Sequence, residues 1–215
     1  MQALLDRYGC LLGEVDDWFA GCLERHGSSI LCNRGCSACC RGLFDITLLD
    51  ALYLRLGFDL LPDAVQRGVR LKAQARLDSL SRGWPAFDSP WILNRIPEAE
   101  WDAMMPEDDE TPCPLLSEKG ECLVYDHRPM TCRLNGIPLI DTSGEELFDD
   151  WCTLNFTSCD PLEFEDLRHP FNDLFAQELL LFRELTRNLL GEAVSELDTI
   201  IPAAVFLDED MIRSA

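Results

Sequence analysis

The sequence predicts a mainly α protein: a small helical domain with irregular, cysteine-rich loops and a long C-terminal helix. Three observations support this prediction. Apolar residues recur at helical spacing near both ends of the chain and after the first cysteines. Six of the 12 prolines fall within residues 83–114, where they interrupt regular elements. The chain also contains 11 cysteines, four of them between Cys32 and Cys40.

Length and composition are those of a globular protein. The 215 residues are 47% hydrophobic and 27% charged, which provides enough apolar side chains to offset the entropy lost on folding. A chain of this length fits one compact domain with an extension. We expect residues 1–159 to form a cysteine-cluster domain with an N-terminal helix, and residues 160–215 to form a helical extension packed on it.

The charge is strongly acidic, with 18 basic and 39 acidic residues and a net charge of -21. Such a field repels nucleic acid and anionic membranes, so neither is expected as a partner, and no protein partner is identified. No apolar run approaches the roughly 20 residues that span a bilayer, and the N-terminus lacks the pattern of a signal peptide. We therefore expect a cytoplasmic protein whose cysteines stay reduced, which favours metal binding over disulfides.

The first element is an amphipathic helix from Met1 to about His26, either continuous or broken near Gly9 or Gly13. Its cysteines, Cys10 and Cys22, are each isolated in sequence. An isolated cysteine in a helix usually packs as a small hydrophobic residue, so neither is expected to bind a metal.

Two helices follow the first cysteines. Thr47, with an acidic residue three positions later, predicts the capped start of a short helix that ends at Gly57. Pro62 opens a longer helix to about Ser81, which is the one noticeably basic helix of the chain. Its basic residues either face solvent or pair with acidic segments elsewhere.

The proline-rich middle is expected to be irregular, apart from a short helix around Pro97 to Met105. It contains Trp84, Trp91 and Trp101, for which packing against the helices is favoured over a ligand pocket. An acidic loop follows at residues 107–110.

Later elements are placed by their turn and cap residues. A turn at Lys119 and Gly120 separates two short extended pieces, and Arg128 with Pro129 opens a helical turn that carries Cys132. A helix is expected from residue 161 to 168, and a long amphipathic helix over residues 171–190, closed by a glycine. The apolar run at residues 200–207 indicates no particular role.

The clustered cysteines predict a metal site. Thiolates that converge from separate loops select zinc, copper(I) or iron–sulfur clusters over hard cations. Eight candidates are enough for two four-thiolate sites, although fewer of them suffice for one. Adjacent cysteines normally point apart, so Cys39 and Cys40 either serve different metal atoms or only one of them binds. The predicted ligands are Cys32, Cys36, Cys39, Cys40, Cys113, Cys122, Cys132 and Cys152.

Charged residues near these cysteines are secondary candidates. Arginines flank both groups of cysteines in sequence and would offset the charge of several thiolates; they are Arg34, Arg41, Arg128 and Arg133. His127 is a weaker candidate for a mixed sulfur and nitrogen site. His26 and His169 lie at predicted helix ends, where a histidine often meets the last carbonyls.

Three motif blocks resemble a known family. They are Cys36-Ser-Ala-Cys39-Cys40-Arg41, then Cys113-Pro114-x-Leu116 with Gly120-x-Cys122-x-x-Tyr125, and Arg128-Pro129-x-Thr131-Cys132-Arg133. Together they resemble the YkgJ-like cysteine-cluster family of zinc- or iron-chelating domains, over roughly residues 30 to 135. The family usually opens C-x2-C-x2-C-C, whereas three residues separate Cys32 from Cys36 here. The resemblance implies a mostly bacterial protein that binds zinc or iron, with some relatives linked to iron–sulfur redox chemistry or to protein lysine methylation.

Two kinds of function remain open at this stage. In the first, thiolates hold zinc or iron and the metal organises the fold or is stored or sensed. In the second, an iron–sulfur cluster transfers electrons or activates a substrate, as in a redox enzyme or an electron-transfer component. The sequence shows no serine, histidine and aspartate triad and no glycine-rich phosphate loop that would indicate another enzyme class.

Overall fold

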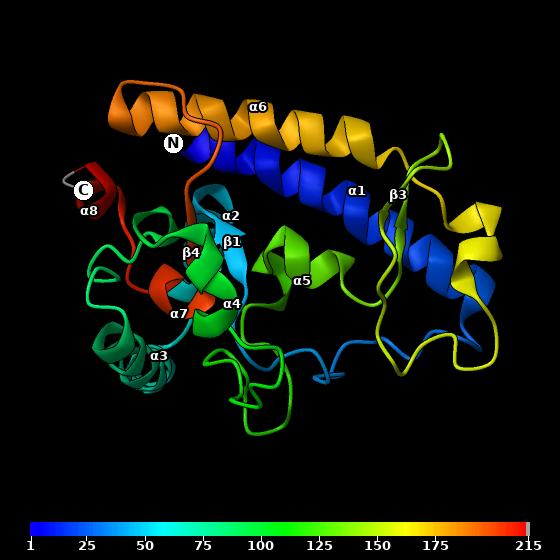
Figure 1. The fold of residues 1–215 in the computed structure, drawn as a ribbon, viewed down its shortest axis with the longest axis horizontal. Helices are drawn as coiled ribbons and strands as arrows, with labels where there is room; N and C mark the ends of the chain where they lie inside the picture. Colours follow the sequence, from blue (N-terminus) through cyan, green and yellow to red (C-terminus); the bar gives the residue numbers. More distant parts are fainter. Residues whose placement is uncertain (214–215) are drawn as a thin grey trace.

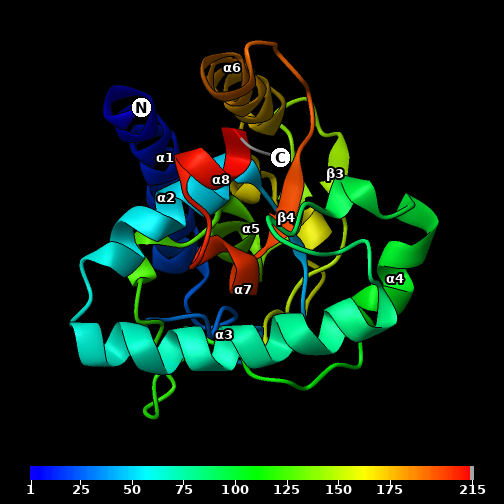
Figure 2. The ribbon, with the colours of Figure 1, turned by 90° about the vertical axis from the view of Figure 1, so that its left-hand side faces the viewer.

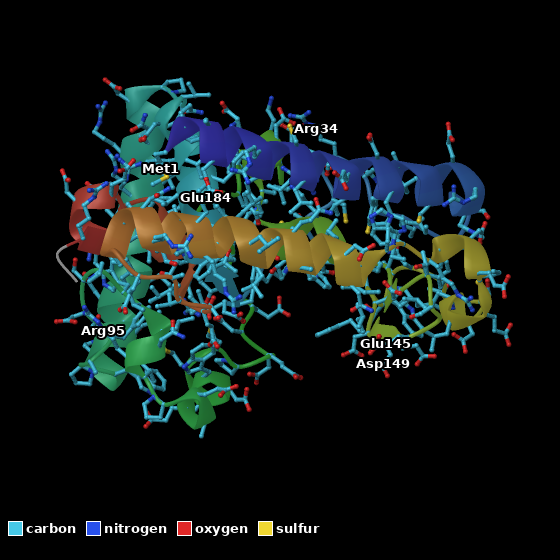
Figure 3. All side chains as sticks on the ribbon, turned by 90° about the horizontal axis from the view of Figure 1, so that it is seen from above. Met1, Arg34, Arg95, Glu145, Asp149 and Glu184 are labelled. Atoms are coloured by element: carbon cyan, nitrogen blue, oxygen red, sulfur yellow. The ribbon has the colours of Figure 1, made fainter. Side chains whose placement is uncertain are left out.

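The computed structural model describes residues 1–213, and these form the mainly α fold that the sequence predicts. The two long helices α1 (Gln2–His26) and α6 (Phe171–Leu190) run side by side along one face of the molecule (Figures 1 and 3). Helix α1 is continuous through both of its early glycines. Helix α6 ends at Gly191, whose left-handed φ of 83° suits glycine.

Beneath α1, helix α2 (Leu48–Asp59) begins with the predicted cap, since the Thr47 side chain accepts a hydrogen bond from the backbone N of Asp50 at 3.1 Å. The short strand β1 (Asp45–Thr47) precedes this helix. It pairs antiparallel with β4 (Asp198–Ile200), so the C-terminal part of the chain lies directly beside the N-terminal helices. After β4, helix α7 (Ile201–Ala204) is buried and α8 (Glu209–Arg213) packs on α6.

Helix α3 (Asp63–Gly83) crosses the opposite side of the molecule from α6 (Figure 2). Arg76 of this helix pairs with Asp109 in the acidic loop. Of the two predicted alternatives, exposure to solvent or pairing with an acidic segment, this residue follows the second. Short turns follow α3. These are the 3-10 turns η1 (Leu93–Arg95) and η2 (Glu98–Glu100), and the four-residue helix α4 (Trp101–Met104). All three tryptophans of this region pack around a second core cluster beside α3.

The middle of the chain supplies η3 (Tyr125–His127) and helix α5 (Met130–Leu134), the helical turn that carries Cys132. A two-stranded hairpin follows, with β2 (Leu139–Ile140) paired to β3 (Glu146–Phe148). Helix α5 packs under α1, where it separates the long helices from the cysteine-rich loops (Figure 1).

One expectation for the C-terminal part needs correction. The helix expected over residues 161–168 is instead a pair of 3-10 turns, η4 (Pro161–Glu163) and η5 (Glu165–Leu167), because Phe164 between them is extended. The apolar run at residues 200–207, to which the sequence assigned no role, is mostly buried core. None of the helices within residues 1–213 combines the length and apolar character that crossing a bilayer requires.

Candidate metal centre

Two loops that are far apart in sequence meet beside α5. The backbone N of Cys113 donates a hydrogen bond to the carbonyl of Cys40 at 2.9 Å, and the N of Gly42 donates to the carbonyl of Thr111, also at 2.9 Å. An isolated antiparallel bridge joins the same two segments. The first cysteine loop is thereby held against the loop that carries Cys113, whose sulfur faces the same cavity.

Tight turns shape each loop. The backbone N of Cys36 donates to the carbonyl of Asn33 at 2.9 Å around Gly35, whose φ of 102° is left-handed. In the second loop, the predicted turn is present: Gly120 has a φ of 77°, and a bridge links Leu116 to Cys122. These turns allow short segments to present several thiols to one side.

Helix α5, which carries Cys132, is anchored to the long helix α1. Arg133 is buried and pairs with Asp16 of α1, and its guanidinium also donates to the carbonyls of Asp126 at 2.8 Å and Arg128 at 3.0 Å. At the start of α5, the backbone N of Met130 donates a hydrogen bond to the buried carboxylate of Asp50 in α2. The position of Cys132 is therefore set by contacts with two helices rather than by its own loop.

Six of the eight predicted ligands line one cavity of about 90 Å³. Three come from the first cysteine loop, and three come from the middle of the chain, two from its loop and one from α5, so the halves predicted from sequence lie together. The thiols surround the cavity without meeting at a single point, and residues 1–213 contain no group of three or more cysteine, histidine or acidic side chains already spaced as a coordination shell. The lining cysteines are Cys36, Cys39, Cys40, Cys113, Cys122 and Cys132.

The remaining two predicted ligands lie outside this cavity. The Cys32 sulfur accepts a hydrogen bond from the Asn155 side chain at 3.2 Å, and both Cys32 and Cys152 lie against Gly136. Asn155 also donates to the Gly136 carbonyl at 2.7 Å, so it ties three loops together. The sequence analysis did not single out Asn155 or Gly136, because no local pattern links positions so far apart in the chain.

Burial, hydrogen bonding and neighbouring thiols raise the pKa of several cysteines that line the cavity. Burial raises the pKa of Cys132 well above its usual value, and the neighbouring Cys113, Cys122 and Cys39 raise it further. Burial also raises the pKa of Cys113 to about 12. For Cys39 the largest cause of a raised pKa is its hydrogen bond with Cys40, followed by burial. Several thiolates in one partly buried cavity need a cation to offset their charge.

Arginines supply part of that positive charge. Burial raises the pKa of Cys122, and Arg128, Arg34 and Arg133 lower it. Two of these guanidinium groups lie over the ring of Tyr125, Arg128 at 3.7 Å and Arg34 at 4.7 Å from the ring centre. Of the four arginines predicted to flank the thiols, Arg41 and Arg128 line the cavity, and each also pairs with a carboxylate, that of Glu110 or Asp16 respectively.

The histidines lie away from the thiols. His127 packs between Gly57 and the ring of Tyr53, His26 pairs with Asp166 at 3.0 Å, and His169 lies against Trp18. None of them is among the residues that line the thiol cavity.

By fold and site, the molecule is a mainly helical cysteine-cluster protein with a soft, sulfur-rich donor set. The chain belongs to the CxxCxxCC family, described as a "putative zinc- or iron-chelating domain", whose family model matches residues 31–153, more than half of the chain. No curated protein and no solved structure matches it.

Proposed function

We propose that this protein binds zinc or iron through the thiols of Cys36, Cys39, Cys40, Cys113, Cys122 and Cys132. The observation that carries the proposal is that these six thiols, from separate parts of the chain, line one cavity. Their chemistry fits the metal, because soft thiolates select zinc and iron over hard cations. Binding would deprotonate the thiols and draw them closer together, since a bound cation stabilises the thiolates that burial now disfavours at Cys132 and Cys113.

One centre in this cavity is favoured over two four-thiolate sites that use all eight predicted cysteines. Cys32 and Cys152 are positioned beside Asn155 rather than in the cavity. The electrostatic influence of Cys36 and Cys39 nevertheless reaches Cys32, so that thiol belongs to the surroundings of the centre. We assign Cys32 and Cys152 a role outside direct coordination.

The second candidate function is an iron–sulfur redox protein. Four of the six thiols would hold an iron–sulfur cluster, the same number that one tetrahedral zinc ion takes. The flanking arginines would also stabilise the anionic, reduced form of such a cluster.

Anaerobic purification, followed by metal analysis and a visible spectrum, tests both candidates. A colourless protein with stoichiometric zinc supports the zinc-binding function. Broad visible absorption that bleaches on reduction supports the iron–sulfur alternative. A fully folded protein that contains neither metal, and takes up neither zinc nor iron when supplied, would overturn both.

Single substitutions test the choice of ligands. We expect Cys132→Ser to lower the metal content to less than about half that of the unmodified protein, because it removes a central thiol. Cys10→Ser is the matched control, since Cys10 is exposed on α1 and lies outside the cavity. Equal losses in the two variants would contradict the assignment.

A further inference from the structure

A second, larger cavity lies on the other side of α5 from most of the thiols. It has a volume of about 430 Å³ and is lined by β1, α2, α5, the β2–β3 hairpin, the segment that follows β3, and α6. Thr131 and Asn135 line both cavities, so the two adjoin at α5. A cavity of this size admits a small organic molecule.

The polar lining of this cavity is acidic. Four carboxyl groups line it, from Asp45, Asp50, Asp150 and Glu178, and no lysine, arginine or histidine is among the lining residues. Within residues 1–213 none of the four takes part in an ion pair with a basic side chain. Carboxylates at the edge of a low-dielectric cavity favour a cation, which here has to come from outside the chain.

Two of these carboxyl groups share one phenol. The Tyr8 hydroxyl lies 2.6 Å from Asp50 Oδ1 and 3.1 Å from Glu178 Oε1. Asp50 also accepts a hydrogen bond from the backbone N of Met130 at 2.8 Å. Because Tyr8 has only one hydrogen to donate, it donates to Asp50, and a protonated Glu178 donates to Tyr8. Burial, with Asp50 as the next cause, raises the pKa of Glu178 to about 8.

The rest of the lining is apolar, with three aromatic side chains. Phe175 comes from α6, Trp151 from the loop after the hairpin, and Phe148 from β3. The Phe148 side chain is 61% exposed, which is unusual for phenylalanine and places an uncovered ring at the edge of the cavity. Aromatic faces attract organic cations as well as packing against their apolar parts.

We propose that this cavity binds a small organic cation, an ammonium group carried on an apolar chain. The carboxyl groups of Asp150 and Glu178 recognise the ammonium, and the aromatic rings pack on the apolar chain. The proposal does not depend on which metal, if any, the neighbouring thiols bind. A bound ligand would end beside α5, next to the thiol cavity.

Titration calorimetry at pH 8.5 tests the proposal, with hexylammonium as the probe and hexanol as its neutral match. At this pH Glu178 is largely ionised and a primary alkylamine is still mostly protonated. We expect hexylammonium to bind about tenfold more tightly than hexanol, and Glu178→Gln and Asp150→Asn each to weaken its binding about fivefold or more. Binding should also strengthen from pH 6.5 to 8.5, as Glu178 loses its proton beside Tyr8, Asp50 and Asp198.

The matched control is Asp173→Asn, because Asp173 lies on the same helix as Glu178 but is exposed and does not line the cavity. It should leave the affinity unchanged. Glu178→Gln should fold, since its amide can still donate to Tyr8. Equal affinities for hexylammonium and hexanol would mean that the cavity is only an apolar void. That result, the absence of binding, or equal losses in Glu178→Gln and Asp173→Asn would each overturn the proposal.

Discussion

Single residues decide how closely the loops around the thiols approach one another. Gly136 has a φ of 117°, and a Cβ atom there would lie 2.9 Å from the Cys32 sulfur and 3.2 Å from the Asn155 side chain. No side chain fits this position without displacing both neighbours. The glycine is therefore required by backbone conformation and by packing together.

Gly136→Ala should destabilise the protein by about 1–3 kcal/mol, through backbone strain and the displacement of Cys32 and Asn155. Urea unfolding monitored by circular dichroism measures the change. Gly13→Ala in α1 is the control, because nothing lies within 4 Å of its Cβ position, and it should stabilise the helix by about 0.5–1 kcal/mol. A Gly136→Ala protein as stable as the unmodified one would contradict this description of the junction.

At the scale of elements, helices α1, α2, α5 and α6 meet at the buried Asp50. Its carboxylate accepts hydrogen bonds from Tyr8 of α1 and from the first amide of α5, and its backbone N is bound by the cap residue Thr47. Glu178 brings α6 into the same network. One buried acid thus fixes the relative positions of four helices, including the one that carries Cys132.

The cap of α2 can be tested alone. Thr47→Ala removes the side chain that accepts from the Asp50 amide, so we expect a loss of about 1 kcal/mol in the free energy of unfolding. Thr47→Ser keeps the accepting hydroxyl and should lose less than half as much. If both variants lost the same stability, strand packing at β1 rather than the cap would explain the effect.

Glu178 of α6 should make stability depend on pH. Its pKa is raised from 4.5 to about 8 in the folded protein, so the folded state holds a proton that the unfolded state has lost between these values. Stability contributed by this group is present below pH 4.5 and falls as the pH rises toward 8. In Glu178→Gln this side chain is neutral at every pH. We therefore expect the free energy of unfolding of the variant to exceed that of the unmodified protein by at least about 1 kcal/mol at pH 8.5.

Denaturant unfolding at pH 5.5 and 8.5 measures this difference. The stability advantage of Glu178→Gln should shrink at pH 5.5. At this pH Glu178 of the folded protein is mostly protonated and therefore neutral, like the glutamine that replaces it. An equal advantage at both pH values would show that Glu178 is not the group that titrates.

For the whole molecule, the thiol cavity joins two loops that are far apart in sequence to the helix that packs under α1. Residues 36–40, residues 113–122 and helix α5 meet there, whereas no residue of α1 or α6 lines the cavity. A metal in the cavity would therefore stabilise the loops most. The formal charge of -21 also disfavours clustering of uncompensated thiolates. A bound cation therefore stabilises this protein more than it would a neutral one.

Removal of the metal by a chelator should lower the melting temperature by about 10 °C, because a ligand that binds only the folded state stabilises it by mass action. Hydrogen exchange should show faster exchange in residues 36–40 and 113–122, while amides in the middle of α1 and α6 remain protected. Uniform loss of protection along the chain would indicate that the metal supports the entire fold. An unchanged melting temperature and exchange pattern would contradict the proposed link.

The sequence alone determined the mainly α class, the cap at Thr47, the glycine end of α6 and the turn that carries Cys132, because each depends on neighbouring residues. It also indicated the metal chemistry, since thiols so densely spaced have few other uses. The 3-10 turns at residues 161–167 escaped prediction because a proline and a cap fit a helix equally well.

Only the tertiary structure decided which cysteines lie together. It placed six around one cavity, joining positions such as Cys40 and Cys113, and it placed Cys32 beside Asn155, 123 residues away in the sequence. It also assembled the acidic cavity from β1, α2, α5, the β2–β3 hairpin and α6, which are far apart in the sequence. Hydrogen bonds and burial between distant segments set these positions, and no spacing along the chain encodes them.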